Sequence, residues 1–183
     1  MDGLSLTQAP LMDMGDMKHA CPYTQPKGAG DGWYTSEVIY IMAGMWGGSA
    51  TVTDGADTTE FSFPELDVAE NGMEKTLTIG DETWVVTFNI QGEPIVGANP
   101  FVLTVHRMAD MLSFPEIPGL SIEVEPTMPS MGHGSEGNIN PVYTENGKYE
   151  GTVVFSMSGG WKVDFPIDNG AGVQTEATFD IEL

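Results

Sequence analysis

Residues 128–165 read MPSMGHGSEGNINPVYTENGKYEGTVVFSMSGGWKVDF. β-Branched and aromatic side chains dominate 151–155, and this composition over a short run is typical of a β-strand. Similar runs occur at 37–42, 83–88 and 101–105. No long segment shows the periodicity of an amphipathic helix. The sequence therefore predicts an all-β protein.

Glycine-containing dipeptides separate these runs. Such dipeptides accept the positive φ angles of tight hairpin turns. Short strands joined by such turns are typical of a β-sandwich. Residues 107–112 are the one stretch for which we expect a short helical turn. The turn dipeptides are Asp31-Gly32, Asp54-Gly55, Asn71-Gly72, Asn146-Gly147 and Asn169-Gly170.

The chain contains an internal repeat. A Met-x-x-Met-x-His pattern occurs at 14–19 and again at 128–133, although the 183 residues include only 3 histidines. Each copy is followed at matching spacing by a Tyr, an alternating apolar run, a Met and a Trp, and such self-similarity indicates a duplicated module. The matched residues are Tyr34, Val38, Tyr40, Met42 and Trp46 in the first copy and Tyr149, Val153, Phe155, Met157 and Trp161 in the second.

The Met-His patterns predict a soft metal site in each copy. Thioether and imidazole ligands together suit Cu(I), whereas Mg²⁺ and Ca²⁺ prefer oxygen ligands. In the second copy the neighbouring Pro, Ser and Gly residues make the setting too polar and too rich in turns for three core side chains, which favours ligation. The alternative is that the methionines fold under the loop as adaptable packing residues. The predicted ligands are Met14, Met17 and His19 in the first copy and Met128, Met131 and His133 in the second.

Three further sulfur residues are candidate ligands. We expect Met42 and Met157 at strand ends on the buried face, because side chains alternate along a strand. There they either pack in the core or complete an environment of three Met and one His. Cys21 follows His19 by two residues. It is either a soft thiolate ligand or a buried apolar residue.

A third cluster, His106 with Met108 and Met111, has no counterpart in the other copy. We interpret it as packing at a strand end, with an auxiliary metal site as the alternative. Trp46 and Trp161 are expected to cap the core of their modules, since large aromatic residues dominate core burial.

Charge and length exclude several classes of function. Acidic residues outnumber basic ones by 27 to 6, for a formal net charge of -21. This charge opposes binding to phosphate backbones and anionic lipid surfaces, so we expect no nucleic-acid partner. No apolar run approaches the roughly 20 residues of a membrane-spanning helix. The first residues also lack the profile of a signal peptide.

Catalysis finds no support in the sequence. No Ser or Cys stands in a plausible arrangement with a His and a carboxylate, so a nucleophilic enzyme is not predicted. One His per copy is also too few for a redox copper enzyme, and the two-His, one-Cys set of a blue-copper site is absent from each copy. We therefore expect a binding protein.

The stretch 128–165 resembles the YtkA-like and FixH-like domains of bacteria. Those modules carry a similar Met-Pro-x-Met-Gly-His, then Gly-x-Tyr, then Phe-x-Met-x-Gly-x-Trp. The segment GANPFVLTV at 97–105 also fits, so the resemblance covers about the last hundred residues, whereas the first copy matches only in its second half. The resemblance implies an immunoglobulin-like β-sandwich outside the cytoplasm, with a role in copper handling or oxidase assembly.

Together these observations predict tandem immunoglobulin-like β-sandwich modules. We expect an incomplete first module at 1–66, a connector at 67–81 and a complete YtkA-like module at 82–183. The predicted function is that of a periplasmic or cell-surface copper carrier, buffer or delivery module, matured by removal of a targeting segment and working with a copper donor or acceptor protein. The alternative is a structural or adhesive module of the cell envelope without a metal role.

Overall fold

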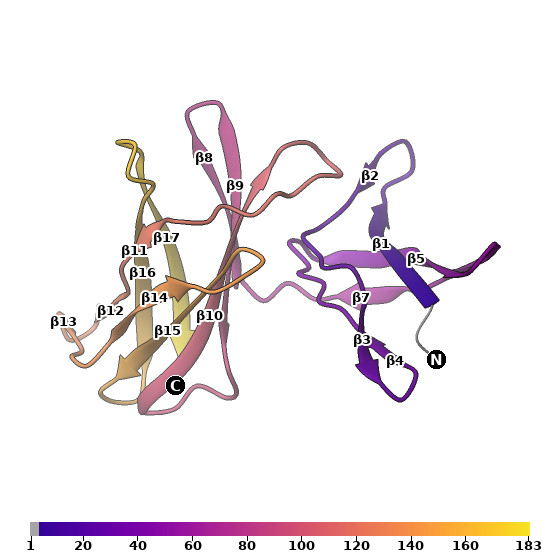
Figure 1. Cartoon of the computed structure of the whole chain (residues 1–183). Helices are drawn as coiled ribbons and strands as arrows, with labels where there is room; N and C mark the ends of the chain where they lie inside the picture. Colours follow the sequence, from indigo (N-terminus) through magenta and orange to yellow (C-terminus); the bar gives the residue numbers. More distant parts are fainter. Residues whose placement is uncertain (1–3) are drawn as a thin grey trace. The chain divides into compact units, whose positions relative to one another are not determined.

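The computed structural model describes residues 4–183, and these residues form seventeen β-strands and no helix (Figure 1). The predicted all-β fold is thereby confirmed. None of the described residues forms a helix that is long and apolar enough to cross a bilayer. The chain divides into two compact units. Unit 1 comprises the chain up to Glu70 together with Ala109–Phe114, and unit 2 comprises Asn71–Met108 and Pro115–Leu183.

Unit 2 is a sandwich of two antiparallel five-stranded sheets. In one sheet the strand order is β14-β15-β10-β9-β8, and in the other β11-β16-β12-β13, with β17 also paired to β16. The first sheet contains β8 (Glu74–Ile79), β9 (Glu82–Ile90), β10 (Gly97–Met108), β14 (Ile139–Tyr143) and β15 (Lys148–Phe155). The second contains β11 (Ser121–Ile122), β12 (Glu125–Met128), β13 (His133–Gly134), β16 (Gly160–Asp168) and β17 (Gln174–Glu182).

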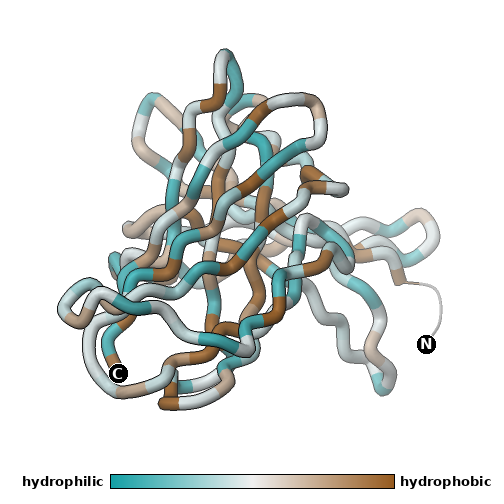
Figure 2. Tube along the Cα trace, turned by 90° about the vertical axis from the view of Figure 1, so that its left-hand side faces the viewer, coloured by the Kyte–Doolittle hydropathy of each residue, from teal (hydrophilic) through white to brown (hydrophobic). Residues whose placement is uncertain are grey.

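The core of unit 2 lies between its two sheets. Hydrophobic and hydrophilic positions alternate along its strands, as the period of two requires (Figure 2). Phe88 lies at the centre of an aromatic cluster, with ring centroids 5.3 Å from Phe101, 5.0 Å from Phe165 and 5.3 Å from Phe179. Such ring pairs contribute roughly 0.5–1.5 kcal/mol each beyond area burial. The cluster therefore joins the two sheets.

Unit 1 is built on a single sheet with the strand order β2-β1-β5-β6, with β7 also paired to β5. A separate hairpin of β3 and β4 accompanies it. The strands are β1 (Leu4–Asp13), β2 (Lys18–His19), β3 (Lys27–Gly30), β4 (Trp33–Thr35), β5 (Gly44–Asp54), β6 (Asp57–Ser62) and β7 (Leu66–Val68). The region 67–81, predicted as a connector, thus holds most of β7, which pairs in unit 1, and all of β8, which pairs in unit 2.

The strand predicted at 37–42 is wrong. Only Val38 there makes a β-bridge, to Tyr23. The matching run of unit 2 is β15, which lies between β10 and β14 in its sheet. Among the described residues of unit 1 no counterpart of β10 stands beside 37–42. A run of high β-propensity becomes a strand only when a neighbour accepts its ladder hydrogen bonds, so propensity alone was not sufficient.

The helical turn predicted at 107–112 is also wrong. Strand β10 continues to Met108, and the chain then reverses in a tight turn closed by Ala109 N–H donating to Ser113 O at 2.9 Å. The Asp110 side chain accepts the Leu112 N–H at 2.7 Å. A short polar side chain that bonds to the nearby backbone in this way favours a turn over a helix.

Two of the predicted turn dipeptides show the backbone that the sequence led us to expect. Asp31 and Asn146 have φ angles of 50° and 52°, and the glycines that follow have φ angles of 79° and 73°. Two successive residues with positive φ are characteristic of the turn that joins antiparallel strands most tightly. These turns join β3 to β4 and β14 to β15.

Candidate metal centres

The Met-His pattern of unit 2 forms the β12–β13 hairpin. Met128 and His133 are directly paired across its two strands. The turn between them is closed by Gly132 N–H, which donates to Met128 O at 2.9 Å. Residues directly opposite on antiparallel strands carry their side chains on the same face, with Cβ atoms about 4.5–5.5 Å apart. The hairpin therefore places a thioether and an imidazole side by side.

The two methionines of this hairpin differ in exposure. Met128 is 2% exposed, whereas Met131 at the turn is 63% exposed. The Met128 ε-methyl lies beside Gly159, 3.4 Å from the position that a Cβ would take there. The loop after β15 thus packs against the buried thioether. The hairpin therefore has one thioether buried in the core, that of Met128, and one exposed to solvent, that of Met131.

A backbone hydrogen bond determines which nitrogen of His133 can bind a metal. Its Nδ1 lies 2.8 Å from Gly134 O. A carbonyl oxygen only accepts, so Nδ1 carries the proton in the neutral ring and Nε2 keeps a lone pair. The ring lies edge-on to Trp161, with centroids 5.9 Å apart. Such a fixed tautomer and ring orientation is what holds a ligating histidine in protein metal sites.

Unit 1 repeats this geometry with different packing. Met12 and His19 are paired across β1 and β2, and His19 Nδ1 lies 2.7 Å from Ala20 O. Both side chains are buried, at 6% and 3% exposure. The Met12 ε-methyl lies beside Gly44, only 2.9 Å from the position of a Cβ there. Gly44 and Gly159 occupy corresponding places in the repeat.

The structure shifts the repeat alignment in the first copy. His19 follows Met12 by seven positions, whereas His133 follows Met128 by five, so the first hairpin has a longer turn. Met14 lies in that turn and is 51% exposed. The counterpart of Met128 is therefore Met12, which the sequence analysis did not place among the ligands. The sequence carried no clear signal for it, because Ala9 to Met12 is a continuous apolar run in which only the folded strand shows which side chains are buried.

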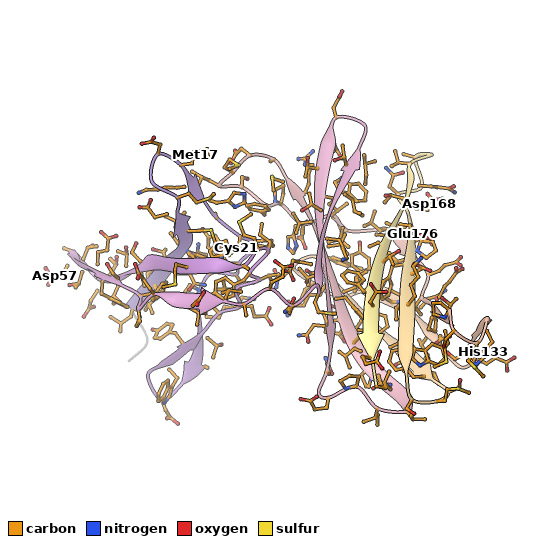
Figure 3. The ribbon with its side chains drawn as sticks, turned by 180° about the vertical axis from the view of Figure 1, so that it is seen from behind. Met17, Cys21, Asp57, His133, Asp168 and Glu176 are labelled. Atoms are coloured by element: carbon orange, nitrogen blue, oxygen red, sulfur yellow. The ribbon has the colours of Figure 1, made fainter. Side chains whose placement is uncertain are left out.

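Met17 remains the counterpart of Met131, because each precedes its histidine by two residues. Met17 is 55% exposed, and Figure 3 shows it in the outer turn of the β1–β2 hairpin. His133 likewise lies in the β12–β13 hairpin in that view. Each hairpin thus presents one exposed thioether at its turn.

The prediction that Met42 and Met157 lie at strand ends on the buried face is wrong. Both lie in bends outside the strands, and Met157 is 39% exposed. Their backbones have an equivalent role, since the carbonyls accept the indole N–H of Trp46 at 3.1 Å and of Trp161 at 3.0 Å. Each bond ties the bend to the Trp that follows it. Met42 is half-buried.

Both tryptophans are buried, each at 1% exposure, in agreement with the predicted capping role. Trp161 belongs to the core cluster of unit 2. Its ring contacts Phe155 with centroids 5.4 Å apart, and Trp46 contacts Tyr40 at 5.2 Å. An equivalent aromatic pair, Phe-Trp in unit 2 and Tyr-Trp in unit 1, therefore packs beside the site in each unit.

Cys21 is buried at 1% exposure, and Figure 3 shows it inside unit 1. Burial raises the pKa of its thiol from 9.0 to about 12, so the side chain is neutral at physiological pH. The corresponding residue of unit 2 is Ser135, whose hydroxyl donates to Val154 O. A neutral thiol in place of a structural serine favours the packing interpretation of Cys21.

The residues of the third predicted cluster, His106, Met108 and Met111, belong to two different units. His106 is 5% exposed in unit 2 and packs against Gly147, where a Cβ would lie 2.7 Å from its Cε1 and Nε2. Burial lowers the pKa of His106 from 6.5 to about 4, although the nearby Glu116 acts in the opposite direction. Met108 also belongs to unit 2, whereas Met111 belongs to unit 1.

Oxygen and nitrogen ligands alone do not make a metal site in the part of the chain that the structure describes. Within residues 4–183 no three His, Cys, Asp or Glu side chains form a group able to hold a metal ion. A groove of about 560 Å³ on unit 2 is lined by Glu123, Glu125, Asp168 and Glu176. It lies at the C-terminal end of β16, whereas Trp161 lies at the N-terminal end of that strand. A metal at the hairpins would need the thioethers.

Comparison with known protein families finds a match for part of unit 2. Residues 115–165 match the YtkA-like family. The resemblance expected from the sequence is confirmed for this segment, which runs from the chain before β11 to the middle of β16 and includes the whole Met128–His133 hairpin. No curated protein matches the chain significantly, and no solved structure does. The YtkA-like segment therefore contains the better exposed of the two candidate centres.

Proposed function

We propose that this protein binds copper as Cu(I) at two Met-His hairpins and acts as an extracytoplasmic carrier, buffer or delivery module. One observation carries the proposal. Two structurally equivalent hairpins each pair a buried thioether with a histidine whose Nδ1 bonds to a backbone carbonyl. Cu(I) is the biological cation that best suits this ligand set.

The charge of the protein supports cation binding. A net charge of -21 raises the local concentration of cations and keeps the protein soluble. The soft ligands select among those cations, because thioethers are neutral and poor ligands for hard ions. The acidic surface therefore attracts cations, and the hairpins provide the selectivity.

The exposed methionines support a transfer role rather than permanent storage. Met131 and Met17 lie in solvent at 63% and 55% exposure, within a few residues of their histidines. A ligand in solvent can meet an incoming donor or acceptor protein without unfolding of the site. The resemblance to YtkA-like domains supports work in the periplasm or at the cell surface. The proposed role is binding and transfer, without a catalytic step.

Competition with a Cu(I) chelator under anaerobic conditions tests the proposal. We expect the intact chain to take up two equivalents of Cu(I). Met128→Leu should remove the unit 2 site, because leucine keeps the buried volume but has no lone pair to donate. Met73→Leu, at another methionine packed against the same core, is the matched control and should retain both equivalents.

A chain that never competes at micromolar chelator would overturn the copper proposal. In that case the structural or adhesive alternative would account better for the hairpins. If Met73→Leu also lost one equivalent, the effect would come from core packing and not from the thioether of Met128.

A further inference from the structure

Residues Ala109–Phe114 pack beside the histidine of unit 1. In sequence they lie between β10 and β11, yet in space they belong to unit 1. The Ala20 N–H donates to Met111 O at 2.8 Å. The Phe114 ring lies 5.7 Å from the His19 ring, at an angle of 42°. Two independent contacts thus hold this turn against the residues of the first Met-His hairpin.

The turn is a fixed structure. Ala109 N–H donates to Ser113 O at 2.9 Å, and Leu112 N–H donates to the Asp110 side chain at 2.7 Å. Just outside it, Arg107 N–H donates to Pro115 O at 2.9 Å. The position of Met111 relative to Ala20 is therefore set by a closed network of hydrogen bonds.

Three methionines of the β1–β2 hairpin and the Ala109–Phe114 turn have side chains that are exposed to solvent and not buried in the core. Met111 is 40% exposed, Met14 is 51% exposed and Met17 is 55% exposed. In contrast, His19 and Met12 are buried. In unit 2 the corresponding histidine contacts Trp161 of its own module. Unit 1 therefore combines a more deeply buried histidine with several exposed methionines in the segments beside it.

We propose that the turn Ala109–Phe114 completes the soft-metal site of unit 1, with the Met111 thioether as an additional ligand and Phe114 as a cover over His19. This inference rests on the proposed function, since it needs Cu(I) binding at His19. It assigns a role to Met111, which the repeat does not explain. It also makes the two sites unequal, because unit 2 has no such turn over His133 among the described residues.

The test uses the full chain carrying His133→Asn, so that only the site in unit 1 remains. Met111→Leu in this background should weaken Cu(I) binding in chelator competition by on the order of tenfold, a typical loss for one removed interaction at a metal site. Met108→Leu is the matched control, because Met108 is close in sequence but belongs to unit 2. Circular dichroism of both variants checks that the fold is retained.

A second measurement reads the thioether directly. Ag(I) is a soft, redox-inert substitute for Cu(I), and ¹³C-labelled methionine ε-methyl resonances report its coordination. We expect the Met111 methyl to shift and saturate together with that of Met12, while the Met108 methyl stays in place. Met111→Leu identifies the resonance.

The outcomes separate the two proposals. A Met12 methyl that shifts while Met111 does not, with unchanged affinity in Met111→Leu, would overturn this inference and leave the copper function intact. If no methyl shifted and the chain did not bind Cu(I), the proposed function would fail, and this inference with it.

Discussion

At the scale of single residues, hydrogen bonds to the backbone determine what the histidines can do. His19 and His133 each direct Nδ1 to the carbonyl of the next residue. His106 instead is buried with Nδ1 lacking a hydrogen-bond partner, the one such side-chain atom among residues 4–183. Three histidines in one chain therefore divide into two candidate ligands and one packing residue, a division that residue type alone does not show.

His106 makes the stability of unit 2 depend on pH. Its pKa is about 4 in the folded chain and 6.5 for the free side chain, because burial disfavours the charged ring. Between these values the unfolded chain binds the proton and the folded chain does not, so folding is weakened as the pH falls from 6.5 towards 4. The expected loss is roughly 1.4 kcal/mol per pH unit in that window.

Urea denaturation at a series of pH values measures this effect. His106→Gln removes the titrating ring but keeps every carboxylate, so the difference between the two curves isolates His106. We expect the curves to converge between pH 6.5 and 4. Parallel curves throughout would show that His106 is not responsible.

At the scale of elements, the hairpin turns position both the sites and the core. The β14–β15 turn contains Gly147 at a φ of 73°. Its N–H donates to Glu116 at 2.8 Å and its carbonyl accepts from Val105 N–H at 2.8 Å. With His106 packed against it, this turn joins β10 to the loop before β11.

Gly147→Ala should destabilise unit 2 strongly. The positive φ alone costs an L-residue about 1–2 kcal/mol. The new Cβ would also lie 2.7 Å from the His106 ring and 2.9 Å from Val105 O, so the neighbours must move. Gly170→Ala is the control, because it has a φ of +71° but nothing within 4 Å of its Cβ. Chemical denaturation should show a clearly larger loss for Gly147→Ala, and equal losses would contradict the packing described here.

At the scale of the whole molecule, the two units have unequal cores. The inner face of β5 carries Gly48, Ala50 and Val52. The equivalent strand β16 of unit 2 has larger residues there, namely Val163, Phe165 and Ile167. Small residues on this face fit a module in which residues 4–70 form no opposing sheet such as the one containing β9 and β10. Unit 1 instead includes Ala109–Phe114 from the later part of the chain.

Expression of the units as fragments tests this asymmetry. Residues 71–183 should fold and unfold cooperatively, because they contain both sheets of the sandwich and its aromatic core. Residues 1–70 should show no cooperative thermal transition by circular dichroism, because a small apolar core rarely offsets the loss of chain entropy. A monomeric, cooperatively unfolding 1–70 fragment would show that unit 1 is complete without Ala109–Phe114.

The sequence by itself determined the features that depend on local chemistry. The short runs of β-branched and aromatic residues predicted the all-β fold and located the strands β9, β10 and β15. Asp31-Gly32 and Asn146-Gly147 predicted tight turns, since few residues accept positive φ. The repeated Met-x-x-Met-x-His pattern located both hairpins. Each of these signals arises from neighbouring residues, so it can be read without knowledge of the rest of the chain.

Only the tertiary structure decided the features that depend on distant partners. The run at 37–42 is not a strand, because it lacks the ladder that β10 provides for β15. Met12 replaces Met14 as the partner of His19, because pairing across the hairpin and not spacing along the chain sets which side chains meet. Met111 reaches unit 1 through a turn nearly a hundred residues from His19 in sequence. Contacts of this kind have no local signature, since they are made by surfaces that exist only after the chain has folded.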